Sequence, residues 1–128
     1  MNAISVILFI VGLIHIIPLR GVLGITSLTA LYGIEISNND IELLLRHRAV
    51  LFGIIGFGLI YSAFKTHCQL AGITIGLIST LSFNLLSLYI GNHNALITRV
   101  VLIDWIAIAL LTIALFLFLY FRYINPIH

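Results

Sequence analysis

The longest apolar stretch of the chain covers residues 95–121 and reads ALITRVVLIDWIAIALLTIALFLFLYF. A helix needs about 20 apolar residues to cross the hydrocarbon core of a bilayer, so this stretch is long enough to span it. Lipid offers no hydrogen bonds to the backbone, and a segment inside it therefore has to be a helix or part of a closed barrel. The run of Ile, Leu, Phe and Ala shows no strand-type alternation, which favours the helix.

Three more apolar stretches precede this one, and short polar breaks separate them. Hydrophobic residues make up 62% of the chain and charged residues 8%, with a mean hydropathy of +1.23. That composition leaves too little polar surface for a fold in water. We therefore predict an all-α integral membrane protein, a four-helix bundle, with the whole chain (1–128) as one transmembrane domain. The predicted helices cover residues 3–19, 40–64, 70–91 and 95–121.

The first predicted helix starts near the N-terminus and is followed by a more polar segment. The N-terminal segment lacks the positive start and the small-residue cleavage site of a signal peptide, so we expect it to be retained as a helix. Residues 22–36, which follow it, are only moderately apolar and contain several Gly, Ser and Thr residues. They predict a short interfacial or re-entrant segment between the first two spans. The cluster Ser37-Asn38-Asn39-Asp40 then marks a helix start.

Polar side chains concentrate in one half of the predicted bundle. Four spans put both termini on one face, and all four acidic residues fall in the opposite half. His15, Asn84 and Asp104 reach into the apolar layer from that half. An ionised carboxylate such as Asp104 costs about 2.5–3.5 kcal/mol there unless it finds a partner. The available partners are Arg46, Arg48, Arg99 and His15, and such a pair could equally serve only to keep helices in register.

A stripe of small residues runs along the second predicted helix at helical spacing. Small residues let another helix come close, so this stripe should face protein and direct Arg46 inward. Its polar end pairs Glu42 with Arg46 at the i,i+4 spacing of a salt bridge. The stripe could also be only a packing seam that ends in a surface ion pair. Its members are Glu42, Arg46, Ala49, Gly53, Gly56, Ile60 and Ala63.

These residues predict a polar site in the half opposite the termini. Its candidate lining is His15, Arg46, His47, Arg48, Asn84, Arg99 and Asp104. Arginines above an apolar bundle suit an amphiphile with an anionic or carbonyl head, such as a phospholipid, fatty acid, isoprenoid or quinone. The simplest alternatives at single positions are that Asn84 and His15 form structural hydrogen bonds.

Three functions are compatible with such a site. The first is a lipid-binding accessory or envelope-associated protein. The second is a small membrane enzyme acting on a lipid or quinone, with Asp104 or His47 as the acid–base group. The third is a transporter subunit, which would need oligomerisation because the chain is short.

The remaining chemistry is limited. We expect no cofactor, although His15 and His47 could in principle ligate a haem from two helices. No His or carboxylate spacing suits a metal centre, and Cys68 has no second cysteine. The chain has neither a phosphate-binding Gly-rich loop nor a nucleophile elbow. Six scattered Lys and Arg residues do not make a nucleic-acid surface. The expected partners are membrane lipids, with a second copy or another membrane protein as possible neighbours.

Several segments resemble those of a known group of proteins. They are GLIHIIP (12–18), LYGI (31–34), LRHRAVLFG (45–53) and Asp104-Trp105. They are similar to small, uncharacterised bacterial inner-membrane proteins with four spans, which are broadly DoxX-like. The resemblance implies a multi-pass protein of the bacterial inner membrane and no particular reaction. Such sequences often carry the label phosphopantetheine adenylyltransferase, which the lack of a soluble nucleotide-binding domain contradicts.

Overall fold

The computed structural model describes residues 2–126, and they contain helices and no strands. Four helical segments are long and apolar enough to cross a membrane, which confirms the predicted multi-pass helical bundle. The elements are α1 (Ala3–Ile16), the 3₁₀ segment η1 (Ile17–Leu23), α2 (Ile25–Tyr32), α3 (Asn39–Phe64), the 3₁₀ turn η2 (Thr66–Cys68), α4 (Gln69–Ile90) and α5 (Ala95–Ile124).

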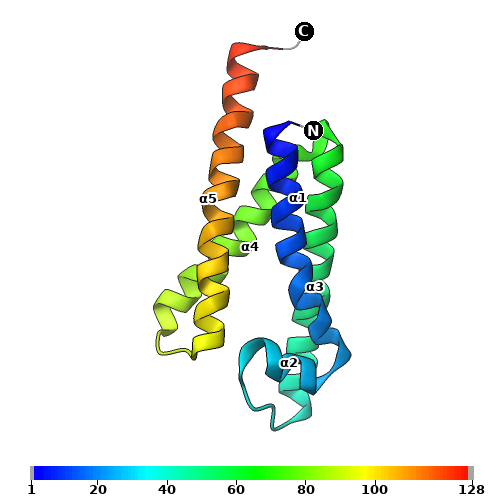
Figure 1. The fold of residues 1–128 in the computed structure, drawn as a ribbon, viewed down its shortest axis with the longest axis vertical. Coiled ribbons are helices and arrows are strands. Elements are labelled where there is room, and N and C mark those ends of the chain that lie inside the picture. The colour runs from blue at the N-terminus through cyan, green and yellow to red at the C-terminus, as the bar shows by residue number, and fades with distance from the viewer. Residues whose placement is uncertain (1, 127–128) are drawn as a thin grey trace.

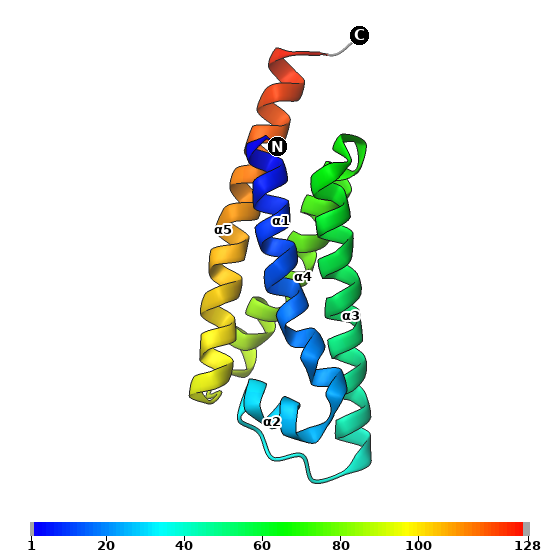
Figure 2. The ribbon, with the colours of Figure 1, turned by 45° about the vertical axis from the view of Figure 1, so that its right-hand side comes forward.

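The four long helices run up and down, with α4 crossing behind the others at an angle (Figures 1 and 2). Both described ends of the chain lie at one end of the bundle, and the C-terminal part of α5 projects beyond the start of α1. The short α2 lies at the opposite end, below α1 and beside α3. It lies within residues 22–36, the segment predicted to be interfacial or re-entrant.

Asparagine side chains begin three of the long helices. Asn2, Asn38 and Asn94 each accept the backbone N–H of the residue three positions further on, at 2.8, 2.9 and 2.9 Å from Oδ1 to nitrogen. Such N-caps satisfy a backbone donor that has no partner within the helix. The observed bounds of α3 and α4, and the start of α5, lie within one residue of the predicted ones.

The first span ends differently from the prediction. Regular α-helix stops at Ile16, and the chain continues to Leu23 as 3₁₀-helix. Pro18 has no N–H for an α-helical hydrogen bond, so the ladder changes just before it. The Ile17 N–H bonds to the Ile14 carbonyl, three residues back, which is the tighter 3₁₀ pattern.

The tightest helix contact joins α1 to α3 through two glycines. A Cβ on Gly12 would lie 2.9 Å from the Gly56 carbonyl oxygen, and a Cβ on Gly56 would lie 2.8 Å from that of Gly12. The predicted stripe of α3 is buried at Ala49, Gly53, Gly56 and Ala63, which confirms that its apolar part faces protein. Around this seam the core closes with Leu8, Leu59, Ile73 and Leu111.

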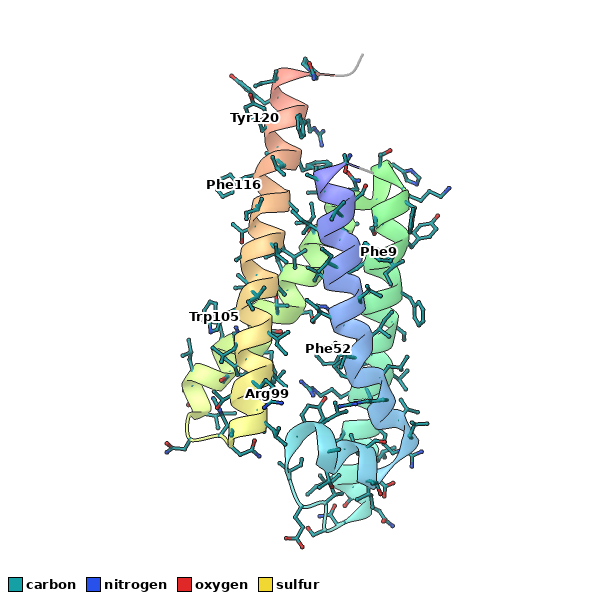
Figure 3. All side chains as sticks on the ribbon, viewed as in Figure 1. Phe9, Phe52, Arg99, Trp105, Phe116 and Tyr120 are labelled. Atoms are coloured by element: carbon teal, nitrogen blue, oxygen red, sulfur yellow. The ribbon has the colours of Figure 1, made fainter. Side chains whose placement is uncertain are left out.

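The outer surface of the bundle is apolar. Trp105 and Phe116 lie on the side of α5 that faces away from the other helices, and both are substantially exposed (Figure 3). Exposed apolar side chains on spanning helices are what contact with lipid tails requires.

Candidate functional site

A small, partly enclosed cavity of about 70 Å³ lies at the α2 end of the bundle; we call it the buried cavity because His15, Tyr32 and Asp104, which line it, are buried. Side chains from α1, η1, α2, α3 and α5 line it, and most of them are apolar. The polar exceptions are His15, Tyr32, Arg48 and Asp104. Three of these four are residues that the sequence had marked as site candidates, so helices far apart in the chain do bring them to one place.

Arg48 is the cation of this cavity, and aromatic rings hold it. Its guanidinium carbon lies 5.2 Å from the ring centre of Tyr32, 4.7 Å from that of Phe52 and 5.2 Å from that of Phe83. Its Nη1 also donates to the Tyr32 hydroxyl at 2.7 Å. Stacking of this kind stabilises a cation and restricts its plane. Arg48 therefore reaches the cavity with its orientation already set.

Asp104 faces the same cavity without an ion pair. The residue is 6% exposed, and no Lys, Arg or His nitrogen lies within 4.0 Å of its carboxylate among residues 2–126. The register-keeping salt bridge considered from the sequence is therefore not formed. Arg48 and Asp104 instead line one small space from two different helices.

His15 is fully enclosed and bonded through both ring nitrogens. Nδ1 lies 3.0 Å from the Val11 carbonyl oxygen, and Nε2 lies 3.3 Å from the Ser79 hydroxyl on α4. A carbonyl oxygen can only accept, so the ring proton belongs on Nδ1. Nε2 is then the acceptor for the Ser79 hydroxyl. The Phe52 ring packs on the imidazole, with ring centres 5.7 Å apart.

An apolar groove of about 400 Å³ runs between α3 and α4 and begins at Arg48. Several of its walls, such as Leu51, Ile75 and Ile78, are 45–64% exposed, so the groove opens to the lipid side. Arg48 and Phe52 line both this groove and the buried cavity. We call it the α3–α4 groove; its lining is Arg48, Leu51, Phe52, Ile55, Ile75, Ile78, Ser79, Ser82, Phe83 and Leu86.

The other predicted site residues lie elsewhere. Arg46 is exposed rather than directed inward, and its Nη1 pairs with Glu42 Oε1 at 3.0 Å, as its spacing predicted. Glu42 and Arg46 both lie in the first turns of α3, at the outer end of the helix, where water can solvate the two charges. His47 and Arg99 are also exposed, and Arg99 projects from α5 near its α2 end (Figure 3). Of the two histidines considered for haem, His15 is buried and His47 is exposed.

Asn84 is buried between α4 and α5. Its Nδ2 donates to the Val101 carbonyl at 3.4 Å, and its Oδ1 has no hydrogen-bond partner within residues 2–126. This contact fits the interpretation of Asn84 as a residue that holds two helices together. It does not line the buried cavity.

Sequence reasoning missed four residues of the site. Phe52 follows Arg48 by one helical turn, so its place on the same face was readable. Tyr32, Ser79 and Phe83 come from other elements, and no local pattern indicated that they meet Arg48.

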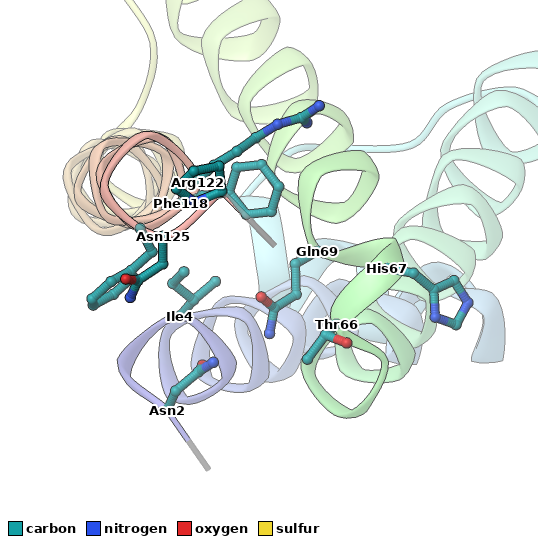
Figure 4. Close-up of a pocket in the computed structure, with 10 residues that line it drawn as sticks. Asn2, Ile4, Thr66, His67, Gln69, Phe118, Arg122 and Asn125 are labelled. Atoms are coloured by element: carbon teal, nitrogen blue, oxygen red, sulfur yellow. The ribbon is translucent and has the colours of Figure 1, made fainter. Parts of the chain in front are cut away.

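A second, larger cavity of about 810 Å³ lies at the end that holds the termini. The ends of α1, α4 and α5 surround it (Figure 4). Two amides on its wall already have structural roles: Asn2 caps α1, and Gln69 Nε2 donates to the buried Ser5 hydroxyl at 3.1 Å. The α2 end, in contrast, combines a cation and an unpaired carboxylate, so we place the candidate site there.

Comparison with protein-family models, with curated proteins and with solved structures found no match for this chain. The resemblance to four-span DoxX-like proteins therefore stays a prediction.

Proposed function

We propose that this protein binds one long-chain amphiphile, with the tail in the α3–α4 groove and an anionic or carbonyl head at Arg48. Its setting would be the bacterial inner membrane, as an accessory or envelope-associated protein. The observation that carries the proposal is the position of Arg48, which lines both the lipid-facing groove and the buried cavity.

The chemistry of Arg48 supports this choice of head group. Within residues 2–126 its one hydrogen bond goes to the Tyr32 hydroxyl, although a guanidinium offers five N–H donors in a fixed fork. Carboxylate and carbonyl oxygens match that fork and give strong, charge-assisted hydrogen bonds. Because aromatic rings already hold the guanidinium, little rotamer freedom would be lost on binding.

The size and lining of the groove support the choice of tail. About 400 Å³ falls within the roughly 300–1,000 Å³ usual for small-ligand sites, and the walls are mainly Ile, Leu and Phe. The buried cavity beyond Arg48 is much smaller, with room for roughly two water molecules at about 30 Å³ each. A compact head such as a carboxyl group suits that space.

Photocross-linking of the purified protein in detergent tests the proposal. The probe is palmitic acid with a diazirine in its chain, and peptide mapping locates the adducts. We expect adducts on residues of the α3–α4 groove. Arg48→Gln should reduce cross-linking at least about tenfold, because a charge-assisted hydrogen bond contributes about 1.5–3 kcal/mol.

The matched control is Arg46→Gln, because Arg46 lies on the same helix but forms an exposed pair with Glu42. It should leave cross-linking unchanged. Adducts spread evenly over the lipid-facing surface, or an equal loss in both variants, would refute the proposed site.

A further inference from the structure

Ser79 and His15 are arranged as a nucleophile and its base. The Ser79 hydroxyl lines the α3–α4 groove and lies 3.3 Å from His15 Nε2, while His15 Nδ1 lies 3.0 Å from the Val11 carbonyl. That order of hydroxyl, imidazole and orienting acceptor is the arrangement that activates a serine. Hydrogen bonds of this type are often long before a substrate binds.

We propose that Ser79 and His15 cleave carboxylic esters of a long acyl chain held in the α3–α4 groove. This inference rests on the proposed binding of an amphiphile there and adds a reaction to it.

Two other serines of α1 and α4 show what is distinctive about Ser79. Ser82 lines the same groove, but its hydroxyl donates to the Ser79 carbonyl at 3.0 Å and meets no imidazole. Ser5 also links α1 to α4, through Gln69, but it is buried at 5% exposure and lines no part of the groove. Ser79 alone of these three combines access to the groove with a basic nitrogen.

The surroundings of His15 favour a neutral ring with one defined tautomer. The residue is 2% exposed, and Phe52 packs on its face. The Val11 carbonyl accepts a hydrogen bond from Nδ1–H, so Nε2 keeps the lone pair that removes a proton from Ser79. The carbonyl thus fixes the orientation of the imidazole ring, as a carboxylate does in other serine enzymes.

The proposed reaction has two balanced halves. In the first, Ser79 Oγ forms a bond to the ester carbonyl carbon while its proton moves to His15 Nε2. The bond from that carbon to the alkoxy oxygen then breaks, and His15 returns the proton to the departing alcohol. In the second, water gives a proton to His15 as its oxygen attacks the carbonyl carbon of the acyl-serine. The bond from that carbon to Ser79 Oγ then breaks, and His15 returns the proton to Ser79, which leaves as the hydroxyl. The products are one carboxylic acid and one alcohol.

Two features of the site complete this chemistry. Arg48 lines the same groove, and we assign it to the carbonyl oxygen, where negative charge develops during attack. The buried cavity lies on the other side of His15 and has room for roughly two water molecules. Water held there would lie beside the ring of the base.

A serine-directed fluorophosphonate with a long alkyl chain tests the inference on the folded protein in detergent. Phosphorus takes the place of the carbonyl carbon, fluoride leaves, and the serine keeps the adduct. We expect adducts at Ser79 and none at Ser82, located by mass spectrometry of the wild-type chain. His15→Gln should slow labelling of Ser79 at least about 100-fold, as general-base catalysis contributes about 10²–10⁴. Ser37→Ala, an exposed serine outside the groove, should label like wild type.

Three outcomes would overturn the inference: no adduct at Ser79, equal labelling of Ser79 and Ser82, or unchanged labelling in His15→Gln. The mapping on the wild-type chain needs no variant, so a variant that fails to fold leaves the test intact. The diazirine probe is used on the same preparation. If the diazirine probe labels the groove but the fluorophosphonate does not label Ser79, the proposed reaction is refuted and the proposed binding function is still supported.

Discussion

At the scale of single residues, the site is defined by charges that lack charged partners. Asp104 is buried without an ion pair, and Arg48 is held by aromatic rings and a tyrosine hydroxyl instead of a carboxylate. Both line one cavity, and yet they form no direct ion pair with each other. Charges kept apart in a low-dielectric space are typical of sites that bind or react rather than of sites that only hold a fold together.

Asp104→Asn distinguishes these two roles. Removing one member of a buried ion pair typically costs about 3–5 kcal/mol, because the partner is left unpaired. Since Asp104 forms no such pair, we expect the free energy of unfolding to stay within about 1 kcal/mol of wild type. Unfolding in mixed detergent measures it. A loss of about 3 kcal/mol or more would show that the carboxylate is paired in the membrane protein.

At the scale of elements, one asparagine joins α2 to the start of α5. Asn94 caps α5 through Oδ1, and its Nδ2 donates to the Tyr32 carbonyl at 2.7 Å. The chain reverses just there at Gly33, whose φ of 64° lies in the left-handed region that glycine adopts without strain. This tether places Tyr32 where its hydroxyl meets Arg48.

Asn94→Ala should therefore loosen α2, whereas Asn38→Ala should not. Both variants remove an N-cap, which costs about 0.5–2 kcal/mol each. Only Asn94 also holds α2, because the Asn38 side chain bonds to its own helix start. Hydrogen exchange followed by mass spectrometry should show faster exchange of the α2 amides in Asn94→Ala alone. Equal exchange in the two variants would contradict the tether.

The α1–α3 seam leads to a second prediction at this scale. A methyl group on Gly56 would lie 2.8 Å from a backbone oxygen, which cannot move aside as a flexible side chain can. Gly56→Ala should thus lower the free energy of unfolding by about 1–3 kcal/mol, the usual cost of overpacking.

Gly58→Ala is the matched control, because nothing lies within 4 Å of a Cβ at that position. It should be neutral or raise stability by up to about 1 kcal/mol, since alanine favours helix over glycine. Both are read from unfolding curves in the same detergent. An equally stable Gly56→Ala would mean that the helices do not approach as described.

At the scale of the whole molecule, the bundle has two unlike ends. One end carries the described termini and η2, and the other carries α2 and the candidate site (Figures 1 and 2). The α3–α4 groove opens sideways, and Arg48 stands near its α2 end. A lipid could therefore enter from the bilayer without passing through water.

Thiol labelling of membrane vesicles checks this arrangement. In a Cys68→Ser background, Ser37→Cys places a thiol at the α2 end and Thr66→Cys places one at the other end; both positions are exposed. An impermeant maleimide added from outside should modify one variant and not the other. Modification of both from the same side, without detergent, would contradict the four-span topology.

Much of the fold was predictable from local patterns. Apolar runs of spanning length predicted the four long helices, and the cluster around Asn38 predicted where α3 begins. The small-residue stripe of α3 predicted its buried face, as Gly53 and Gly56 show. Pro18 indicated only that the first helix should end nearby, whereas the structure shows that its chain continues as 3₁₀-helix.

The site was only partly predictable. Depth along a helix follows from the residue count, and so the sequence correctly grouped His15, Arg48 and Asp104 in one half of the bundle. Direction around the helix axis is less certain at helix ends, which is why Arg46 was wrongly directed inward. Nothing local related Tyr32 to Arg48, because that contact depends on how the α2 segment folds back.

The amino-acid sequence by itself determined that the chain folds in a lipid bilayer, how many spans it has and how deep each polar group lies. These properties follow from composition and from a rise of about 1.5 Å per residue. Only the tertiary structure decided which polar groups meet. Ser79 and His15 are 64 positions apart, and their contact depends on the crossing of α4 over α1. A helical pattern specifies which side of a helix is polar, but the rotation and crossing of helices are set by side-chain packing between them.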